Sequence, residues 1–314
     1  MRRLPAATVA DLVASNFTEL LVPARYGGTQ AEFPAILDPV RRMAHGCASS
    51  AWTIGFYALH NWMLALFDEP AQEEAFATRP FLAPAPLAPT GRGVPVDGGV
   101  RLSGRWSWAT GSNDVVIVDA FVPAHRVVRV SDIYTGTAPG AGLHDATTCR
   151  WPMVPAFSLL AAMPALGSAE RVADIYAERL SKRVLAYEGV TRKNKPIAQA
   201  HLGEARVRLR ALHGLLAETV GEIETLIATG DPVPRLVRGE ARMAAAHIVH
   251  ESRAVIGWLL EASGARAHFL DNPLQRIKRD VDVLSGHVVF DYDTSRELAG
   301  ALTLGMKVSR TAMV

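Results

Sequence analysis

Cysteine and net charge are both scarce in this sequence of 314 residues, and each scarcity excludes a class of protein. The two cysteines, Cys47 and Cys149, are too few for a disulfide framework or a cysteine zinc site. The 33 basic residues nearly balance the 31 acidic ones, and a net charge of +2 gives no electrostatic signature of nucleic-acid or anionic-membrane binding. Because 49% of the residues are hydrophobic, the chain can bury a large core.

A secretion signal is also missing from the first residues. Arg2 and Arg3 are followed by Pro5, Thr8 and Asp11, where a signal peptide would carry an uninterrupted apolar core and a small-residue cleavage site. The low cysteine content suits a reducing compartment. We therefore expect a cytoplasmic protein.

Residues 46–67 contain no charged side chain, over a length sufficient to cross a bilayer. Several polar side chains nevertheless disfavour a lipid-exposed helix. They are Ser49, Ser50, Thr53, His60 and Asn61. We therefore predict a buried helix inside a sizeable domain. One face of this helix mixes polar and apolar groups as a cavity wall does. It comprises Thr53, Tyr57, His60 and Leu64.

Strand-like sequence lies within residues 81–130. Its centre, GRWSWATGSNDVVIVDAFVPAHR at residues 104–126, has the pattern of two strands with only a Ser-Asn pair between them. Pro123 cannot donate to a sheet ladder, so it marks the end of the second strand. The two strands are predicted to be antiparallel neighbours, joined by a tight turn through residues 111–113.

Four long periodic segments follow a loop over residues 131–155, as in an up-down helical bundle. Their predicted spans are residues 157–186, 198–227, 234–263 and 274–304. Gly230 and Gly264 suit helix ends, whereas Asp231 and Asn272, each followed by proline, suit N-caps.

The last predicted helix carries a stripe with spacings of three and four residues. Its members are Leu274, Ile277, Val281, Leu284 and His287. The stripe predicts that the His287 ring points into the bundle.

Several motifs, in the right order along the chain, resemble those of the acyl-CoA dehydrogenase fold superfamily, in the branch of two-component flavin-dependent monooxygenases that hydroxylate phenols and polyketide aromatics. They are LLVPARYGG at 20–28, CASSAWTIGFYALHNW at 47–62, APTGRGVPVDGGVRLSGRWSWATG at 88–111 and NPLQRIKRD at 272–280. In that family the strand resembling DVVIVDAFVPAHR comes much later than the one resembling GRWSWATG. The resemblance therefore implies an internal deletion in the β-domain, together with a shortened N-terminus.

The resemblance implies a mostly α, acyl-CoA dehydrogenase-like fold with N-terminal helices, a reduced antiparallel β-domain and a C-terminal four-helix bundle. The expected parts are an N-terminal helical part at 1–80, the β-domain at 81–130, a connecting loop at 131–155 and the bundle at 156–314. Members of the family associate through the bundle, so a homodimer or homotetramer is expected.

The resemblance also implies roles for seven side chains. Two would be catalytic: His60 as a base near the substrate hydroxyl, and His287 near the C4a edge of the flavin. The cofactor-binding residues would be Thr110, Trp108 and Arg279, and the substrate-binding residues Tyr57 and Asn61. The residues alone also fit a structural reading, in which the histidines are core side chains and Thr110 is a turn threonine.

The function implied is that of an oxidoreductase, a monooxygenase that receives reduced FMN or FAD by diffusion from a flavin reductase and acts on a phenolic or polyketide-like aromatic. The alternative is a flavin-free descendant that serves as a ligand-binding or partner subunit, or as a non-redox catalyst. An acyl-CoA dehydrogenase would need a glutamate base, and residues 272–292 offer aspartates but no glutamate. No metal site is predicted, because His247, His250 and Glu251 lack a Glu-x-x-His partner on another helix.

Overall fold

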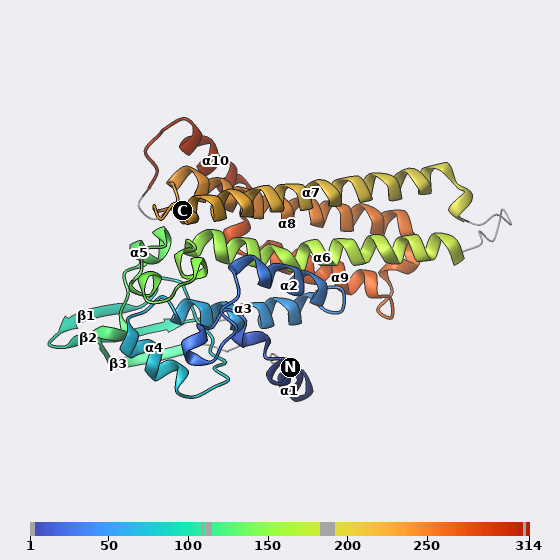
Figure 1. The fold of residues 1–314 in the computed structure, drawn as a ribbon. Coiled ribbons are helices and arrows are strands. Elements are labelled where there is room, and N and C mark those ends of the chain that lie inside the picture. The colour runs from blue at the N-terminus through green and yellow to red at the C-terminus, as the bar shows by residue number, and fades with distance from the viewer. Residues whose placement is uncertain (1–3, 108–109, 111–114, 183–191, 310–311) are drawn as a thin grey trace. The chain divides into compact units, whose positions relative to one another are not determined.

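The computed structural model describes residues 4–107, 110, 115–182, 192–309 and 312–314, and Figure 1 labels the helices and strands. The chain forms two compact units, and each contains buried apolar side chains of its own. The first unit comprises Met1–Ile36, Thr53–Phe157 and Glu224–Val233. The second comprises Leu37–Trp52, Ser158–Ile223 and Pro234–Val314.

The first unit contains most of α3 (Ala48–Leu64), the uncharged helix that the sequence predicts to be buried. Its residues Leu59 and Trp62 are completely inaccessible to solvent. The Trp62 indole Nε1 donates to the carbonyl oxygen of Thr148 over 2.8 Å, and its ring meets Phe33 edge-on. Three shorter helices also lie in this unit. They are α1 (Ala6–Ala14), α4 (Glu69–Phe76) and α5 (Val130–Thr135).

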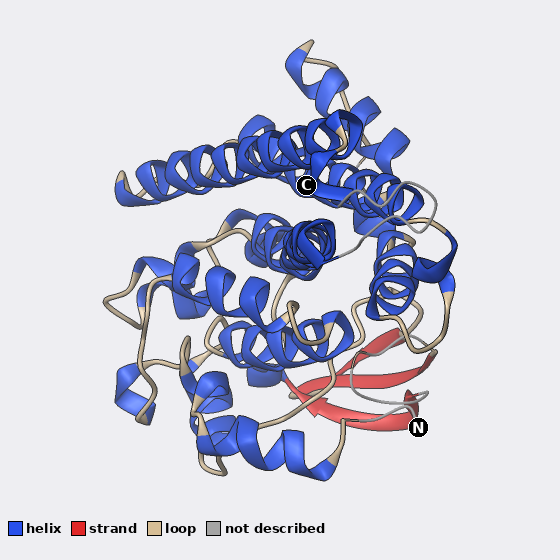
Figure 2. Cartoon of the chain, turned by 90° about the vertical axis from the view of Figure 1, so that its right-hand side faces the viewer, coloured by secondary structure: helices blue, strands red, loops and turns tan. Residues whose placement is uncertain are grey.

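A three-stranded antiparallel sheet contains the strands of the described chain, and Figure 2 shows it in red among the helices. Its strands, in the order β1-β2-β3, are β1 (Arg92–Val96), β2 (Gly99–Trp106) and β3 (Val115–Pro123). A two-residue turn joins β1 to β2, with Gly98 at φ 75°, as the sequence Asp-Gly favours. Trp106 pairs with Val115, so the predicted antiparallel pairing of β2 and β3 is confirmed. The predicted turn at 111–113 lies outside the described residues.

The second unit is helical and is dominated by long helices that lie alongside one another (Figure 1). They are α6 (Met153–Lys182), which begins in the first unit, α7 (Pro196–Ala228) and α8 (Arg235–Ser263). Arg206 of α7 reaches Asp174 of α6 over 2.7 Å. Shorter helices α2 (Leu37–Met43), α9 (Pro273–Ser285) and α10 (Tyr292–Thr303) complete the unit.

Helix α6 is the helix of the described residues whose length and composition would allow a membrane span, and 89% of the relevant window is buried inside the protein. Pro164 lies within it without ending it. The burial identifies α6 as a core helix.

The helix ends follow the predicted chemistry at three of four positions. Gly230 and Gly264 adopt positive φ, and the Asn272 side chain caps α9 by accepting from the backbone N–H of Leu274 over 3.1 Å. The prediction for Asp231 is wrong, because α8 begins only at Arg235, after two prolines that keep the intervening chain extended.

The predicted single helix over 274–304 is also wrong, since the chain leaves the helix at Ser285 and resumes it at Tyr292. Two side chains satisfy backbone N–H groups at this break. His287 accepts from Val289 over 3.3 Å, and Asp291 caps α10 by accepting from Thr294 over 2.8 Å. Consequently His287 lies outside the buried stripe of α9 and is exposed, in contrast to the inward position expected from its spacing.

Candidate functional site

His60 lies on α3, and only 2% of its surface is accessible. Its Nδ1 donates to the carbonyl oxygen of Ala83 over 2.6 Å, which leaves the lone pair on Nε2. The rings of Phe56 and Phe157 lie 5.9 and 6.4 Å away between centroids. Burial lowers the pKa of the imidazole, and the bond to Ala83 only partly opposes this effect. His60 is therefore a neutral imidazole near pH 7 with an acceptor nitrogen, the state that a general base requires.

Tyr57 and Asn61 flank His60 on α3. Burial raises the pKa of the Tyr57 phenol, so this side chain stays protonated. Asn61 is completely inaccessible and donates through Nδ2 to the carbonyl oxygen of Thr18 over 2.9 Å. Its buried Oδ1 accepts no hydrogen bond within the described part of the chain. Their substrate-binding roles stay predictions.

The predicted cofactor-binding residues after β2 are only partly described. Thr110 lies in a turn and is partly exposed, whereas Trp108 falls outside the described residues. The neighbouring Trp106 is buried, and its indole donates to the carbonyl oxygen of Ala88 over 2.8 Å. This bond anchors the end of β2 just before Thr110.

His287 belongs to the second unit. Because its Nδ1 accepts from the backbone N–H of Val289, its Nε2 carries the proton and is a hydrogen-bond donor. Trp52 and Phe290 lie 5.6 and 6.1 Å from the ring between centroids. The residue is exposed, yet loss of hydration beside these rings lowers the pKa of the imidazole. His287 is thus a neutral donor at the surface of its unit.

Arg279 lies on α9 and is exposed, so its guanidinium is accessible to an anion from solution. Its neighbour Asp280 has a raised pKa because burial outweighs the attraction of Arg276 and Arg279. His247 and His250, which do not form part of the predicted site, lie against Tyr292. His250 stacks on its ring at 4.0 Å, and His247 Nδ1 is 3.0 Å from its hydroxyl.

Comparison with known proteins gives matches over nearly the whole chain. Residues 159–292 match the family described as acyl-CoA dehydrogenase, C-terminal domain. The oxygenase subunit HsaA of a flavin-dependent monooxygenase from Mycobacterium tuberculosis is 29% identical, over 98% of this chain and 90% of the relative. The crystal structure of 3-HSA hydroxylase from Rhodococcus sp. RHA1 is 28% identical and superposes with a TM-score of 0.91, over 100% of this chain and 93% of that one.

The chain has the acyl-CoA dehydrogenase-like fold and is similar along its length to oxygenase subunits of flavin-dependent monooxygenases. It is accordingly an oxidoreductase, and the predicted fold class, with its small antiparallel sheet and helical bundle, is confirmed. The alignment with HsaA extends over 355 residues, whereas this chain has 314, so at least 41 positions of the relative have no counterpart here.

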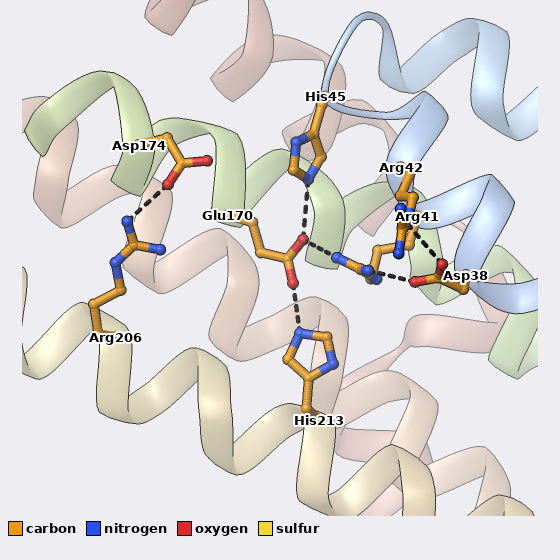
Figure 3. Close-up of polar contacts among 8 residues, drawn as sticks. All are labelled: Asp38, Arg41, Arg42, His45, Glu170, Asp174, Arg206 and His213. Carbon is orange, nitrogen blue, oxygen red and sulfur yellow. Dashed lines mark hydrogen bonds and ion pairs between the residues drawn. The ribbon is translucent and has the colours of Figure 1, made fainter. Parts of the chain in front are cut away.

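A further polar cluster, which the sequence does not predict, lies in the second unit and is centred on Glu170 of α6. The Glu170 carboxylate accepts hydrogen bonds from three side chains, as Figure 3 shows. They are Arg41 of α2, His45 just after α2 and His213 of α7. His45 Nε2 lies 3.0 Å from Oε2, and the Glu170 side chain is 12% exposed. Arg41 resembles an ordinary solvated helix-end residue in the sequence. Its partner lies 129 positions away, and no local pattern reveals such a pair.

The environment of Glu170 makes it sensitive to acid. Burial raises the pKa of its carboxyl group, but the hydrogen bonds from His45 and His213 and the charge of Arg41 outweigh burial and lower it. A carboxyl group whose pKa is lower in the folded than in the unfolded protein stabilises the fold at pH values above its unfolded pKa. That contribution is lost as the pH falls through the folded pKa.

We expect Glu170→Gln to lower the free energy of unfolding at pH 7 by about 1.5–3 kcal/mol, because charge-assisted hydrogen bonds are lost from a nearly buried group. The difference from the wild type should begin to shrink below about pH 4.5, the ordinary pKa of the carboxyl, and disappear below its lowered pKa in the folded protein. Urea denaturation at pH 7, 5 and 3.5 measures it. Glu204→Gln, which removes an exposed pair with Arg208, is the control and should change stability by less than about 0.5 kcal/mol. A pH-independent loss in Glu170→Gln would contradict the assignment.

Proposed function

We propose that this chain is the oxygenase component of a two-component monooxygenase that hydroxylates a phenolic or polyketide-like aromatic, using reduced FMN or FAD from a separate reductase. Relatives with full-length matches support the reaction class. They include HsaA and, at 24% identity, a resorcinol hydroxylase of Rhizobium described as FADH2-dependent. The protein acts in the cytoplasm in this proposal, where a diffusing reduced flavin is available.

The observation that carries the proposal is the hydrogen bond from His60 Nδ1 to Ala83. It fixes the tautomer in which Nε2 accepts a proton, and burial keeps the ring neutral. A phenol that donates its proton to Nε2 becomes a phenolate, whose ortho carbon is more nucleophilic. His60 thus serves as the base that activates the substrate. Tyr57 and Asn61 lie on the same helix, where they would position the aromatic ring.

The residues assigned to the cofactor have the chemistry that a flavin requires. Thr110 offers a hydroxyl, Arg279 an exposed cation suited to phosphate, and His287 a neutral Nε2–H suited to the C4a edge. Trp108 is assigned to the ring system by family resemblance. When bound, reduced flavin supplies the two electrons with which O2 is split, so that one oxygen atom enters the substrate and the other leaves as water.

The proposed enzyme is a homodimer or homotetramer that associates through the bundle. Exposed apolar side chains on α7, among them Ile197 and Val207, support an interface on these helices. Light scattering at micromolar concentration tests it, and a monomer would contradict it.

The decisive experiment incubates the purified protein with photoreduced FMN or FAD, oxygen and a panel of phenols. We expect a flavin-dependent product with a mass increase of one oxygen atom, labelled by 18O2 and not by labelled water. Flavin binding is followed by absorbance in both redox states. Failure to bind either oxidised or reduced flavin would favour the flavin-free alternative, a ligand-binding or partner subunit.

Thr110→Val tests the cofactor site directly. Loss of one hydroxyl hydrogen bond should weaken reduced-flavin affinity by about three- to tenfold, because such a bond contributes about 0.5–1.5 kcal/mol. Anaerobic titration measures the dissociation constant. Thr78→Val, at an exposed position of the same unit, is the matched control and should bind as the wild type does. Equal affinities in all three proteins would remove Thr110 from the site.

A further inference from the structure

The outer edge of β3 is open in the described chain. The sheet has the order β1-β2-β3, so β1 and β3 are its two edges. In an antiparallel strand, every second residue directs its N–H and C=O groups away from the paired neighbour. Along β3 these groups form a row with no strand beside it among the described residues. Such a row is a template for a further strand.

The two edges differ in how well they are protected. Strand β1 has five residues with Pro95 near its middle, and proline lacks the N–H that a new strand would need. Strand β3 has nine residues, its proline is the last of them, and its only charged side chain is Asp119. Lysine and arginine, which commonly prevent edge pairing, are absent from it. The edge of β3 is therefore the one that accepts a strand.

Asp119 forms a bulge that leaves the edge on both sides of it usable. Leu102 pairs with Ala120 and Gly104 with Ile117, so β3 contains one extra residue at this point. Asp119 adopts φ 47°, donates its N–H to Ser103 Oγ over 2.9 Å and accepts from Arg101 at its carbonyl over 2.9 Å. The polar groups of the bulge are thus satisfied inside the sheet.

The side chains of β3 are unusually exposed for an apolar strand. Val116, Val118 and Phe121 are 60%, 81% and 48% exposed. β-Branched and aromatic side chains in a sheet are ordinarily stabilised by cross-strand neighbours. An adjacent strand of similar composition would provide those neighbours.

We propose that β3 pairs with β3 of a second copy of this chain, antiparallel about a two-fold axis, so that two three-stranded sheets join into one of six strands. A two-fold axis makes an antiparallel edge complementary to itself. With a single carboxylate in each strand, a register with Ile117 on the axis places Asp119 opposite Val115 of the other copy and avoids like-charge contact.

Charge favours edge pairing over stacking of the two sheets face to face. Arg101 of β2 lies on the face that carries Phe121, with which it pairs. Stacking would bring the Arg101 side chains of the two copies to within about 10 Å of each other, which is the distance between packed sheets. Edge pairing keeps them three strand spacings apart, roughly 14 Å, where repulsion with a screening length of about 8 Å is weaker than at about 10 Å. The second copy therefore adds at the edge.

The test compares wild type with Val116→Lys/Val118→Lys and with Val130→Lys, a control at a 58% exposed valine of α5, outside the bundle. Multi-angle light scattering from 1 to 100 μM should show that the β3 double variant lacks one two-fold association step, so that its molar mass is half that of the wild type. The wild type and the Val130→Lys protein should both show this association step, which the double variant lacks. Circular dichroism establishes that each protein is folded.

Hydrogen exchange on the unmodified protein provides an independent measurement. The outward amides of β3 should exchange more slowly as protein concentration rises, whereas the β1 and β2 amides should show no such dependence. Exchange that is fast at every concentration, or a double variant with wild-type mass, would overturn the proposal. Slow exchange independent of concentration would also overturn it, because the edge would then be covered within one chain. Flavin binding measured on the same proteins separates this result from the proposed activity.

Discussion

His60→Gln is expected to lower turnover of a phenolic substrate by about 10²-fold or more, the usual loss when a general base is removed. Glutamine retains an N–H that can donate to the Ala83 carbonyl, so the local fold is preserved, but it has no nitrogen that takes up a proton near pH 7. The dissociation constant for reduced flavin should change less than about twofold, because the proposed role of His60 concerns the substrate hydroxyl alone.

Stopped-flow and steady-state product formation measure the effect of His60→Gln. The control is His125→Gln, a change at another histidine of the same unit that pairs with Glu74 at the surface over 3.0 Å, and it should keep wild-type turnover. A large loss of flavin binding in His60→Gln, at unchanged turnover of the bound fraction, would contradict the assignment as a base.

The pH profile provides a second readout of His60. Burial lowers its pKa from an ordinary value of about 6.5, so the ring remains neutral and able to accept a proton throughout the neutral range. Turnover should therefore hold constant from pH 8 to below about pH 6.5 and decline only in more acidic solution. In His60→Gln this acidic limb should be absent. An acidic limb that begins above pH 7 would show that another group controls the reaction.

The parts of the fold that the sequence predicts well are those that local chemistry determines. The uncharged segment of α3 could only be buried, and the capping of α9 by Asn272 follows from an Asn-Pro pair at a helix start. The pairing of β2 with β3 followed from two strand-like pieces too close in sequence for any other connection. In each example the cause lies within a few residues of its effect.

The candidate site is harder to predict because its decisive features depend on distant residues. The spacing that placed His287 on a buried stripe assumes a continuous helix, and the chain instead breaks where His287 and Asp291 satisfy backbone groups with their side chains. The tautomer of His60 depends on the carbonyl of Ala83, 23 residues away in an irregular segment. Family resemblance identified both histidines, whereas their protonation and exposure required coordinates.

The environment of Gly167 in α6 gives the second large effect that we expect. A Cβ atom at this position would overlap the carbonyl oxygen of Arg41 and lie 2.9 Å from its carbonyl carbon and 3.2 Å from the Cβ of Ala44. The obstacle is backbone of α2, which cannot rotate away as a side chain could. Glycine at this point lets α2 approach α6 closely enough for the Arg41 guanidinium to reach Glu170, three residues further along α6.

Gly167→Ala should therefore lower the free energy of unfolding by about 3 kcal/mol, at the upper end of the usual cost of overpacking, despite a gain in helix propensity of about 1 kcal/mol. Gly214→Ala in α7 is the matched control, because no atom lies within 4 Å of the added Cβ, and it should stabilise the protein by about 1 kcal/mol. Urea denaturation at pH 7 distinguishes the two by the sign of the change. The double variant Gly167→Ala/Glu170→Gln should lose less free energy of unfolding than the sum of the two single losses, since displacement of α2 already separates Arg41 from the carboxylate. Equal stabilisation by both alanines would mean that α2 does not rest on Gly167, and the Glu170 cluster would then have to form without this contact.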